Sequence, residues 1–314
     1  MIFYSLKPMG ENKDKSHDLL PIFLMGGFFV IIHCLALLLV WPFDTAGMQA
    51  FEETNDPINL IYIFAIILVI TLIILLIAKF WKKKLIQFII LGAIGYTAFW
   101  VFSPLFILIL SDLFALFISA LLAIILVIIL YKFPEWYVID ICGIIVGAGA
   151  IAIFGISLGI LLVIFLLIGL AIYDAISVYK TKHMIDLADT VMDLKLPVLL
   201  VVPKIRHYSL IKETKSLKKK LEEKEERDAF FMGLGDVVMP GILVAASFRF
   251  IENGLPIAFS VMLGTLIGFS ILMVFVIKGK PQAGLPLLGG GAILGYIVSS
   301  LVLYGELVGI NTLF

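Results

Sequence analysis

The segment FMGLGDVVMPG, residues 231–241, places a carboxylate, Asp236, just after two glycines and just before an apolar run. The run continues as GILVAAS and is long enough to enter a lipid bilayer. An ionisable side chain inside a membrane span is costly, so its presence marks a functional site. The segment therefore predicts a membrane protein with a functional Asp236, and it raises the question of a second carboxylate.

The composition excludes a large soluble protein. Of 314 residues, 62% are hydrophobic and 15% are charged, and the mean hydropathy is +1.16. Apolar runs of about 20 residues recur, each long enough to cross a bilayer. Cys34 and Cys142 lie in separate apolar segments and the four histidines are scattered. We therefore expect a lipid environment, with no disulfide, metal, cofactor or nucleic-acid partner.

The apolar runs predict an all-α polytopic membrane protein with nine transmembrane helices. The predicted helices are residues 19–41, 58–80, 85–110, 113–131, 137–154, 156–178, 230–247, 256–277 and 285–304. Ser111 and Asp112 supply the turn between the third and fourth helices, and the fifth and sixth meet at Gly155. The first apolar run lacks an A-x-A-like cleavage site and is interpreted as a retained helix, not a signal peptide.

A long charged loop divides the chain into three parts. Residues 1–178 hold helices one to six, residues 179–229 form the loop, and residues 230–314 hold helices seven to nine. If the helices alternate in direction, all Lys and Arg residues except Arg249 fall on the side of this loop. The positive-inside rule then predicts a multi-pass protein of the cell membrane. Its N-terminus and the 180–228 loop are cytoplasmic, and its C-terminus is outside.

Two carboxylates lie deeper in the predicted spans than the others. Asp112 and Asp140 lie near span ends and are interpreted as interfacial carboxylates in contact with water. Asp174 and Asp236 lie six to eight residues inside the two boundaries of the charged loop, which is about 9–12 Å at helical rise. Their helices run antiparallel and are joined by that loop, so the two carboxylates can face each other at one depth.

Such a pair has a chemical use. Two carboxyls about 3 Å apart share one proton, so that the ionised group can activate a water while the protonated group polarises a peptide carbonyl. This is the chemistry of aspartic proteases. Depth and pairing alone leave open a cation channel or a proton-coupled transporter, and also carboxyls that only bond to helix ends or to a tyrosine.

Three motifs resemble those of the presenilin and signal peptide peptidase family. They are Tyr173-Asp174 (the YD motif), Gly233-Leu234-Gly235-Asp236 (the GxGD motif) and PQAGLPLL at 281–288, which is similar to the PAL region. Leu285 and Pro286 match the Leu and following Pro of that region, whereas Ala283 and Gly284 stand at its Pro and Ala positions. The motifs occur in the family's order, on predicted helices six, seven and nine.

The resemblance implies an intramembrane aspartyl protease that hydrolyses peptide bonds within transmembrane helices. Asp174 and Asp236 would be catalytic, with support from Tyr173, Gly233 and Gly235, where the glycines allow a substrate backbone or a helix to come close. The residues implied in substrate binding are Gly284, Leu285, Pro286 and Leu287. The short N-terminus and compact loops indicate a prokaryotic member of archaeal type without an obligatory partner subunit, and a homo-oligomer stays open.

Other functions remain as alternatives to this interpretation. A prepilin-type leader peptidase also uses a GxGD aspartate, but the PAL-like element argues against it. A channel or transporter would use the same acids. A catalytically silent scaffold is disfavoured because both aspartates are retained.

One apolar stretch of the loop, LPVLLVVPK at 196–204, is too short to span a membrane and is bracketed by prolines. It predicts either a strand over Val198–Val202 that pairs with an unwound substrate, or a segment that lies on the bilayer surface. Extended backbone around Gly284–Leu287 is a second candidate for substrate pairing. The spacings Gly143/Gly147, Gly155/Gly159, Gly264/Gly268 and Gly291/Gly295 are interpreted as helix packing.

Overall fold

A computed structural model of the chain describes residues 16–80, 83–181, 199–204, 208–210, 229–277 and 282–310. Nine α-helices lie in these ranges. They are α1 (Ser16–Thr45), α2 (Ile58–Phe80), α3 (Lys83–Ile107), α4 (Asp112–Lys132), α5 (Trp136–Ser157), α6 (Ile160–Ile176), α9 (Leu234–Phe250), α10 (Leu255–Ile277) and α11 (Gly284–Tyr304). Within the described chain, seven are long and apolar enough to cross a membrane, and the other two are α2 and α9. The predicted set of nine helices is confirmed in number and order.

The turns between helices follow the sequence closely, with one shift. Ser111 is the N-cap of α4, as the predicted turn requires. The turn between α5 and α6 lies at Leu158 and Gly159 and not at Gly155, which stays inside α5. Gly155 is needed there for packing, because a Cβ on it would overlap Ala245 of α9.

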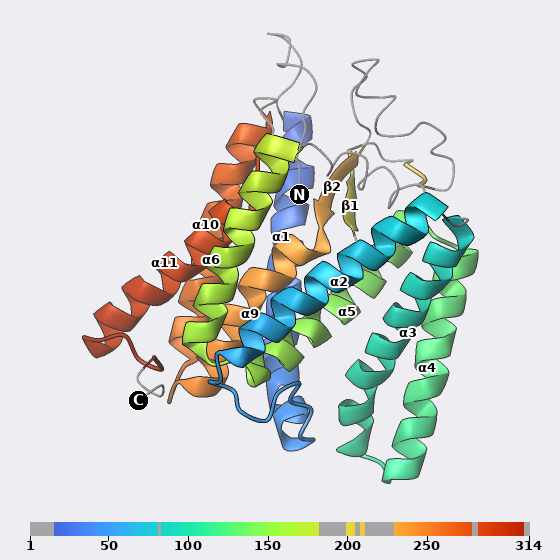
Figure 1. The fold of residues 1–314 in the computed structure, drawn as a ribbon, viewed down its shortest axis with the longest axis horizontal. Coiled ribbons are helices and arrows are strands. Elements are labelled where there is room, and N and C mark those ends of the chain that lie inside the picture. Colours follow the sequence, from blue (N-terminus) through green and yellow to red (C-terminus); the bar gives the residue numbers. More distant parts are fainter. Residues whose placement is uncertain are drawn as a thin grey trace.

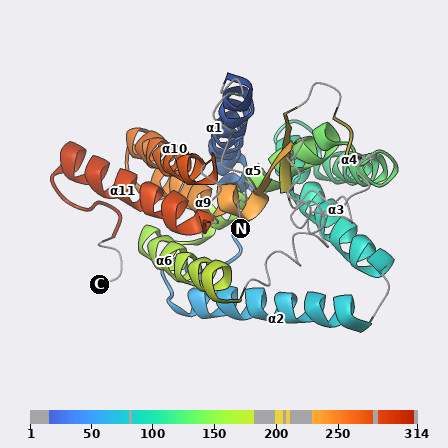
Figure 2. The same ribbon diagram turned by 90° about the horizontal axis from the view of Figure 1, so that it is seen from above.

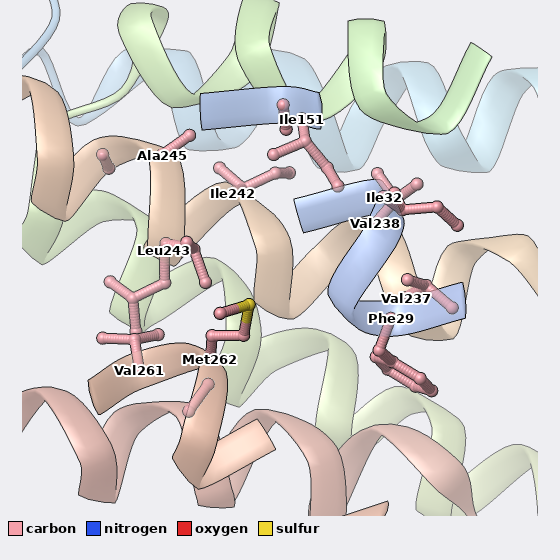
Figure 3. Packing of buried hydrophobic residues seen from close by; sticks show 14 of the residues in the cluster. Phe29, Ile32, Ile151, Val237, Val238, Ile242, Leu243, Ala245, Val261 and Met262 are labelled. Atoms are coloured by element: carbon pink, nitrogen blue, oxygen red, sulfur yellow. The ribbon is translucent and has the colours of Figure 1, made fainter. Parts of the chain in front are cut away.

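Helix α9 lies at the centre of the bundle and contacts α1, α5, α6, α10 and α11. Its side chains are apolar around most of its circumference, as expected of a helix with protein on all sides. Figure 3 shows Val237, Val238 and Ile242 of α9 among Phe29 and Ile32 of α1 and apolar residues of α5 and α10. Because α9 begins within the GxGD motif and carries Asp236 in its first turn, this packing holds Asp236 inside the bundle.

Helices α10 and α11 touch through their backbones. A Cβ on Gly264 would overlap the carbonyl of Gly291, and one on Gly291 would overlap the carbonyl of Gly264. Gly268 and Gly295 make the same kind of close approach to the facing helix. Small residues are the usual means of close helix contact where lipid replaces water, and the packing role predicted for these four glycines is confirmed.

A two-stranded antiparallel hairpin interrupts the helical fold. Strand β1 (Leu199–Pro203) pairs with β2 (Ala229–Gly233), with Val201 opposite Phe231. The seventh helix, predicted over 230–247, therefore begins only at Leu234, and this correction changes the surroundings of Asp236. The sequence AFFMG is apolar and continuous with the helix, so periodicity alone could not separate strand from helix there.

The hairpin is buried on both faces. Leu200, Val202 and Met232 belong to the main core, whereas Val201 and Ala229 belong to a smaller core formed with α3, α4 and α5. Figure 2 shows the hairpin between these two groups of helices. A hairpin alone is marginally stable, and burial of alternate side chains on opposite faces stabilises this one.

The opposite end of the bundle carries an ion pair. Arg249, near the end of α9, contacts Asp44, near the end of α1, with 2.9 Å between Nε and Oδ2. The pair is partly exposed and contributes at most about 1 kcal/mol. It links the two helices at the end remote from the hairpin.

The glycine contact between α10 and α11 predicts a selective loss of stability. Gly291→Ala places a methyl group against backbone of α10 and should lower the free energy of unfolding by about 1–3 kcal/mol, seen as a lower thermal midpoint in detergent. Gly290→Ala is the matched control, since a Cβ on Gly290 meets nothing within 4 Å among the described residues. Equal midpoints for the two variants would contradict the packing account.

Candidate active site

Asp174 lies near the end of α6, where the helix widens into a π-helical turn over Ser177–Thr181. Its side chain is only 2% exposed, and its Oδ2 accepts a hydrogen bond of 3.1 Å from the backbone N–H of Leu285. Leu285 belongs to the first turn of α11, where N–H groups have no partner within the helix. The carboxylate therefore satisfies a helix N-terminus from a residue 111 positions away.

Asp236 lies in the first turn of α9, after the N-cap residue Gly233. Its side chain is 4% exposed. The depth predicted for Asp236 requires eight helical residues after the charged loop. That prediction is wrong, because strand β2 occupies residues 229–233. The correction puts Asp236 at a helix N-terminus, where the aligned peptide dipoles favour a carboxylate.

The two carboxylates meet the same short piece of backbone. Leu285 bonds to Asp174, and a Cβ built on Gly284 would lie 3.3 Å from Oδ2 of Asp236. Because Gly284 and Leu285 are consecutive, these two contacts limit the distance between the contacting carboxylate oxygens to about 10 Å. Helices α6, α9 and α11 thus bring two buried acids together at the end of the bundle that holds the hairpin (Figure 1).

Glycine at position 284 has a physical reason at this site. A side chain there would press against the Asp236 carboxyl, so glycine keeps the approach between α11 and α9 open. At Gly235, by contrast, a Cβ would meet nothing within 4 Å among the described residues. The space beside Gly235 is therefore not filled by a described part of the protein.

The remaining predicted site residues are placed differently from one another. Tyr173 is 54% exposed and lies on another face of α6 than Asp174, so its supporting role stays a prediction. Leu285, Pro286 and Leu287 lie in the first turns of α11. The extended backbone expected over Gly284–Leu287 is therefore wrong. Proline is tolerated at this point because its missing N–H would have had no helical partner.

Residues outside the motifs also support the site. The Nε2–H of His33, on α1, donates to the carbonyl of Val237 at 3.0 Å, just after Asp236. Pro240 lacks the N–H that would otherwise bond to the carbonyl of Asp236, so the helix backbone is weakened there. His33 anchors this turn to α1. The sequence gives no sign of this role of His33, because the bond joins residues 204 positions apart and carries no local pattern.

A second tie joins the ends of α6 and α11. The hydroxyl of Tyr179, in the π-helical turn, donates to Oε1 of Gln282 at 2.8 Å. Gln282 lies two residues before Gly284, so the bond links the end of the helix with Asp174 to the entry of α11. Single-turn π-helices are frequent at functional sites.

Of the two carboxylates interpreted as interfacial, only one fits that description. Asp112 begins α4 and is exposed. Asp140 is 3% exposed, and its Oδ1 accepts a hydrogen bond of 2.8 Å from the N–H of Val201 in β1. The interfacial interpretation of Asp140 is therefore wrong, because the hairpin covers it.

A helical membrane bundle with two buried aspartates at adjoining helix ends defines the class of polytopic proteins with an intramembrane carboxylate site. The chain matches the family described as signal-peptide peptidase, presenilin aspartyl protease, over residues 26–304. The chain belongs to this family.

Two solved structures agree with this assignment. Both are of a presenilin family intramembrane aspartate protease, in C222 and P2 crystals. The first shares 32% identity at a TM-score of 0.64, covering 90% of this chain and 98% of the other. The second shares 34% identity at a TM-score of 0.67, covering 91% and 99%. No curated protein matches the chain by sequence.

Proposed function

We propose that the protein is an intramembrane aspartyl protease in which Asp174 and Asp236 share the acid and base roles. The observation that carries this proposal is the convergence of the two buried carboxylates on the Gly284–Leu285 backbone, in a chain of this family. The acid and base roles are assigned to the two carboxyls together, as a dyad, and not to one residue.

The reaction needs only the dyad and a water. The ionised carboxyl accepts a proton from the water as its oxygen attacks the peptide carbonyl, and the protonated carboxyl gives its proton to the carbonyl oxygen. The tetrahedral gem-diol then collapses: the carboxyl that took the water proton gives it to the amine, the C–N bond breaks, and the other carboxyl takes back a proton from a gem-diol hydroxyl. Burial by α6, α9 and α11 excludes bulk water and strengthens these interactions.

The rival functions fit less well. A channel or transporter would use the same acids, but family membership and the GxGD and PAL-like motifs favour proteolysis. Leader peptidases share the GxGD aspartate, whereas the bond of Asp174 to Leu285 and the closeness of Asp236 to Gly284 give the PAL-like segment a place in this site.

The hairpin supports a mode of substrate binding. A helical substrate hides its peptide groups in hydrogen bonds, so the bond to be cut lies in an unwound stretch whose backbone needs new partners in lipid. Strand addition at a sheet edge supplies them. The backbone N–H of Val201 donates to Asp140 and therefore does not bond to β2. In an antiparallel pair, the N–H and C=O of the opposite residue, Phe231, then also point away from the partner strand.

The edge of β2 is therefore a better candidate for substrate pairing than β1, although the sequence predicts that pairing for Val198–Val202. Strand β2 leads directly into α9, five residues before Asp236 at Phe231. A substrate strand paired there would run beside the dyad. Val198, the first residue of the strand predicted over Val198–Val202, lies outside the described residues. For this residue, the alternative of a position on the bilayer surface stays a prediction.

We further propose that the end of the bundle that holds the hairpin faces the cytoplasm. If the helices alternate in direction, the segments on that side carry all Lys and Arg residues except Arg249. The substrates would be transmembrane-helix proteins cut toward their cytoplasmic ends, without an obligatory partner subunit.

The dyad predicts that Asp174→Asn and Asp236→Asn each lower the rate of cleavage by about 10²-fold or more, because neither carboxyl can perform both proton transfers. The measurement is mass spectrometry of products from a transmembrane-helix substrate incubated with purified protein. Asp112→Asn, which changes an exposed carboxylate, should cleave like wild type. Full activity in either single dyad variant rules the mechanism out.

The β2 edge predicts an effect of Phe231→Pro, which removes an outward N–H without breaking a hairpin bond. Loss of one substrate hydrogen bond should reduce kcat/KM by about tenfold. Phe231→Leu keeps the N–H and is the control for the lost ring. If proline and leucine have the same effect, the backbone of Phe231 does not bind substrate.

The orientation predicts opposite labelling of single cysteines in a background without Cys34 and Cys142. A cysteine in 180–228 should react only after the cells are opened, and one in 44–56 should react with an impermeant reagent in intact cells. Labelling of both positions from outside would overturn the topology.

A further inference from the structure

Asp140 is a buried carboxyl that the proposed reaction does not use. It lies on α5, and its position against β1 gives it one clear contact, the 2.8 Å bond from Val201. Its second oxygen, Oδ2, is buried and has no hydrogen-bond partner in the part of the chain that the structure describes. A carboxyl that remains buried at such a cost needs a function.

We infer that Asp140 is a positioning residue that closes the outer edge of β1, so that an unwound substrate can pair only with β2. This inference rests on the proposed function, since it concerns how the same site receives its substrate. A residue of α5 would then determine which edge of the hairpin can pair with the substrate.

The edge of β1 has few donors to begin with. The register places the backbones of Leu199, Val201 and Pro203 on the side away from β2. Pro203 has no N–H, and the N–H of Val201 is bonded to Asp140. Only Leu199, at the start of the strand, retains an outward donor that the structure does not engage in the hairpin. Proline and an inward-pointing charge are common means of blocking a sheet edge.

The edge of β2 is not blocked in this way. Its outward residues are Ala229, Phe231 and Gly233, none of which is proline. Outside the hairpin, no backbone hydrogen bond from Phe231 to another described residue is present. Among the described residues, the outward N–H of Val201 is therefore engaged and that of Phe231 is not, so the two edges of the hairpin differ, and the β2 edge leads to Asp236.

A second carboxylate on the same helix holds the chain beyond β1. Glu135, the N-cap residue of α5, accepts hydrogen bonds from the Ser209 hydroxyl at 2.6 Å and from the Leu210 N–H at 3.1 Å. Val201 and Leu210 are buried in the same small core. The start of α5 thus fixes both the strand and the segment that follows it.

Two substitutions of Asp140 distinguish the role of its hydrogen-bond acceptor from the role of its side-chain shape. Asp140→Asn keeps a carbonyl oxygen for Val201 and should leave KM within about twofold of wild type. Asp140→Leu keeps the branched shape of the side chain but removes the acceptor, which leaves the Val201 N–H free to compete for substrate. Its KM should rise by about tenfold while kcat falls less, and the products should include cuts at new positions. Asp112→Leu, at an exposed helix start, should match wild type.

Amide hydrogen exchange tests the bond from the Val201 N–H to Asp140 without any substrate. In wild type, the Val201 amide should exchange more slowly than the Phe231 amide, and Asp140→Leu should abolish the difference while Asp140→Asn keeps it. This measurement can be made even if no peptide is cut, so failure of the proposed function is distinguished from failure of the inference about Asp140. If Asp140→Leu does not fold, the wild-type comparison of the two amides decides.

Three results would overturn the inference. One is equal exchange of Val201 and Phe231 in wild type. Another is an Asp140→Leu protein with unchanged KM and unchanged cleavage positions. The third is equal impairment of the Asn and Leu variants, because that would show that the acceptor oxygen is not what matters.

Discussion

The hydrogen bond from the Leu285 N–H to Asp174 is the contact on which the arrangement of the site depends. In lipid, the unpaired N–H groups of a helix start are costly, and a buried carboxylate is costly as well. Here each satisfies the other. The bond joins α6 to α11, and because Gly284 precedes Leu285, it also sets the position of α11 against Asp236 of α9.

The rest of the bundle supports this junction by close backbone contact. Glycines bring α10 against α11 and α5 against α9, so the helices that carry or flank the carboxylates have little freedom to separate. The His33 bond to Val237 holds α9 where Pro240 interrupts its own hydrogen bonds. The hairpin is packed between two groups of helices, with alternate side chains in two separate cores.

Much of the fold could be predicted from the sequence because bilayer thickness fixes the length of apolar runs. The nine helices and the turn at Ser111 follow from length and turn chemistry. The start of α9 could not be predicted in the same way, because residues 229–233 are apolar in either conformation and only pairing with β1 makes them a strand. Asp140 and His33 gain their partners from segments far away in the chain, which a single sequence does not show.

Equal depth in two helices predicts the pairing of Asp174 with Asp236, but residues 229–233 form a strand and not a helix. The structure nevertheless brings both acids to one place, because both lie at helix ends and share the start of α11. That shared position, and not equal helical depth, is the physical basis of the proposed dyad.

The most direct test of the account uses the purified protein in sealed vesicles that also contain a transmembrane-helix substrate. Peptide cleavage and cation flux are measured in the same vesicles, with and without a transition-state mimic of aspartic proteases. The account predicts cleavage that the mimic abolishes and no flux above protein-free vesicles. Cation flux that the mimic leaves unchanged, with no peptide cut, would contradict it.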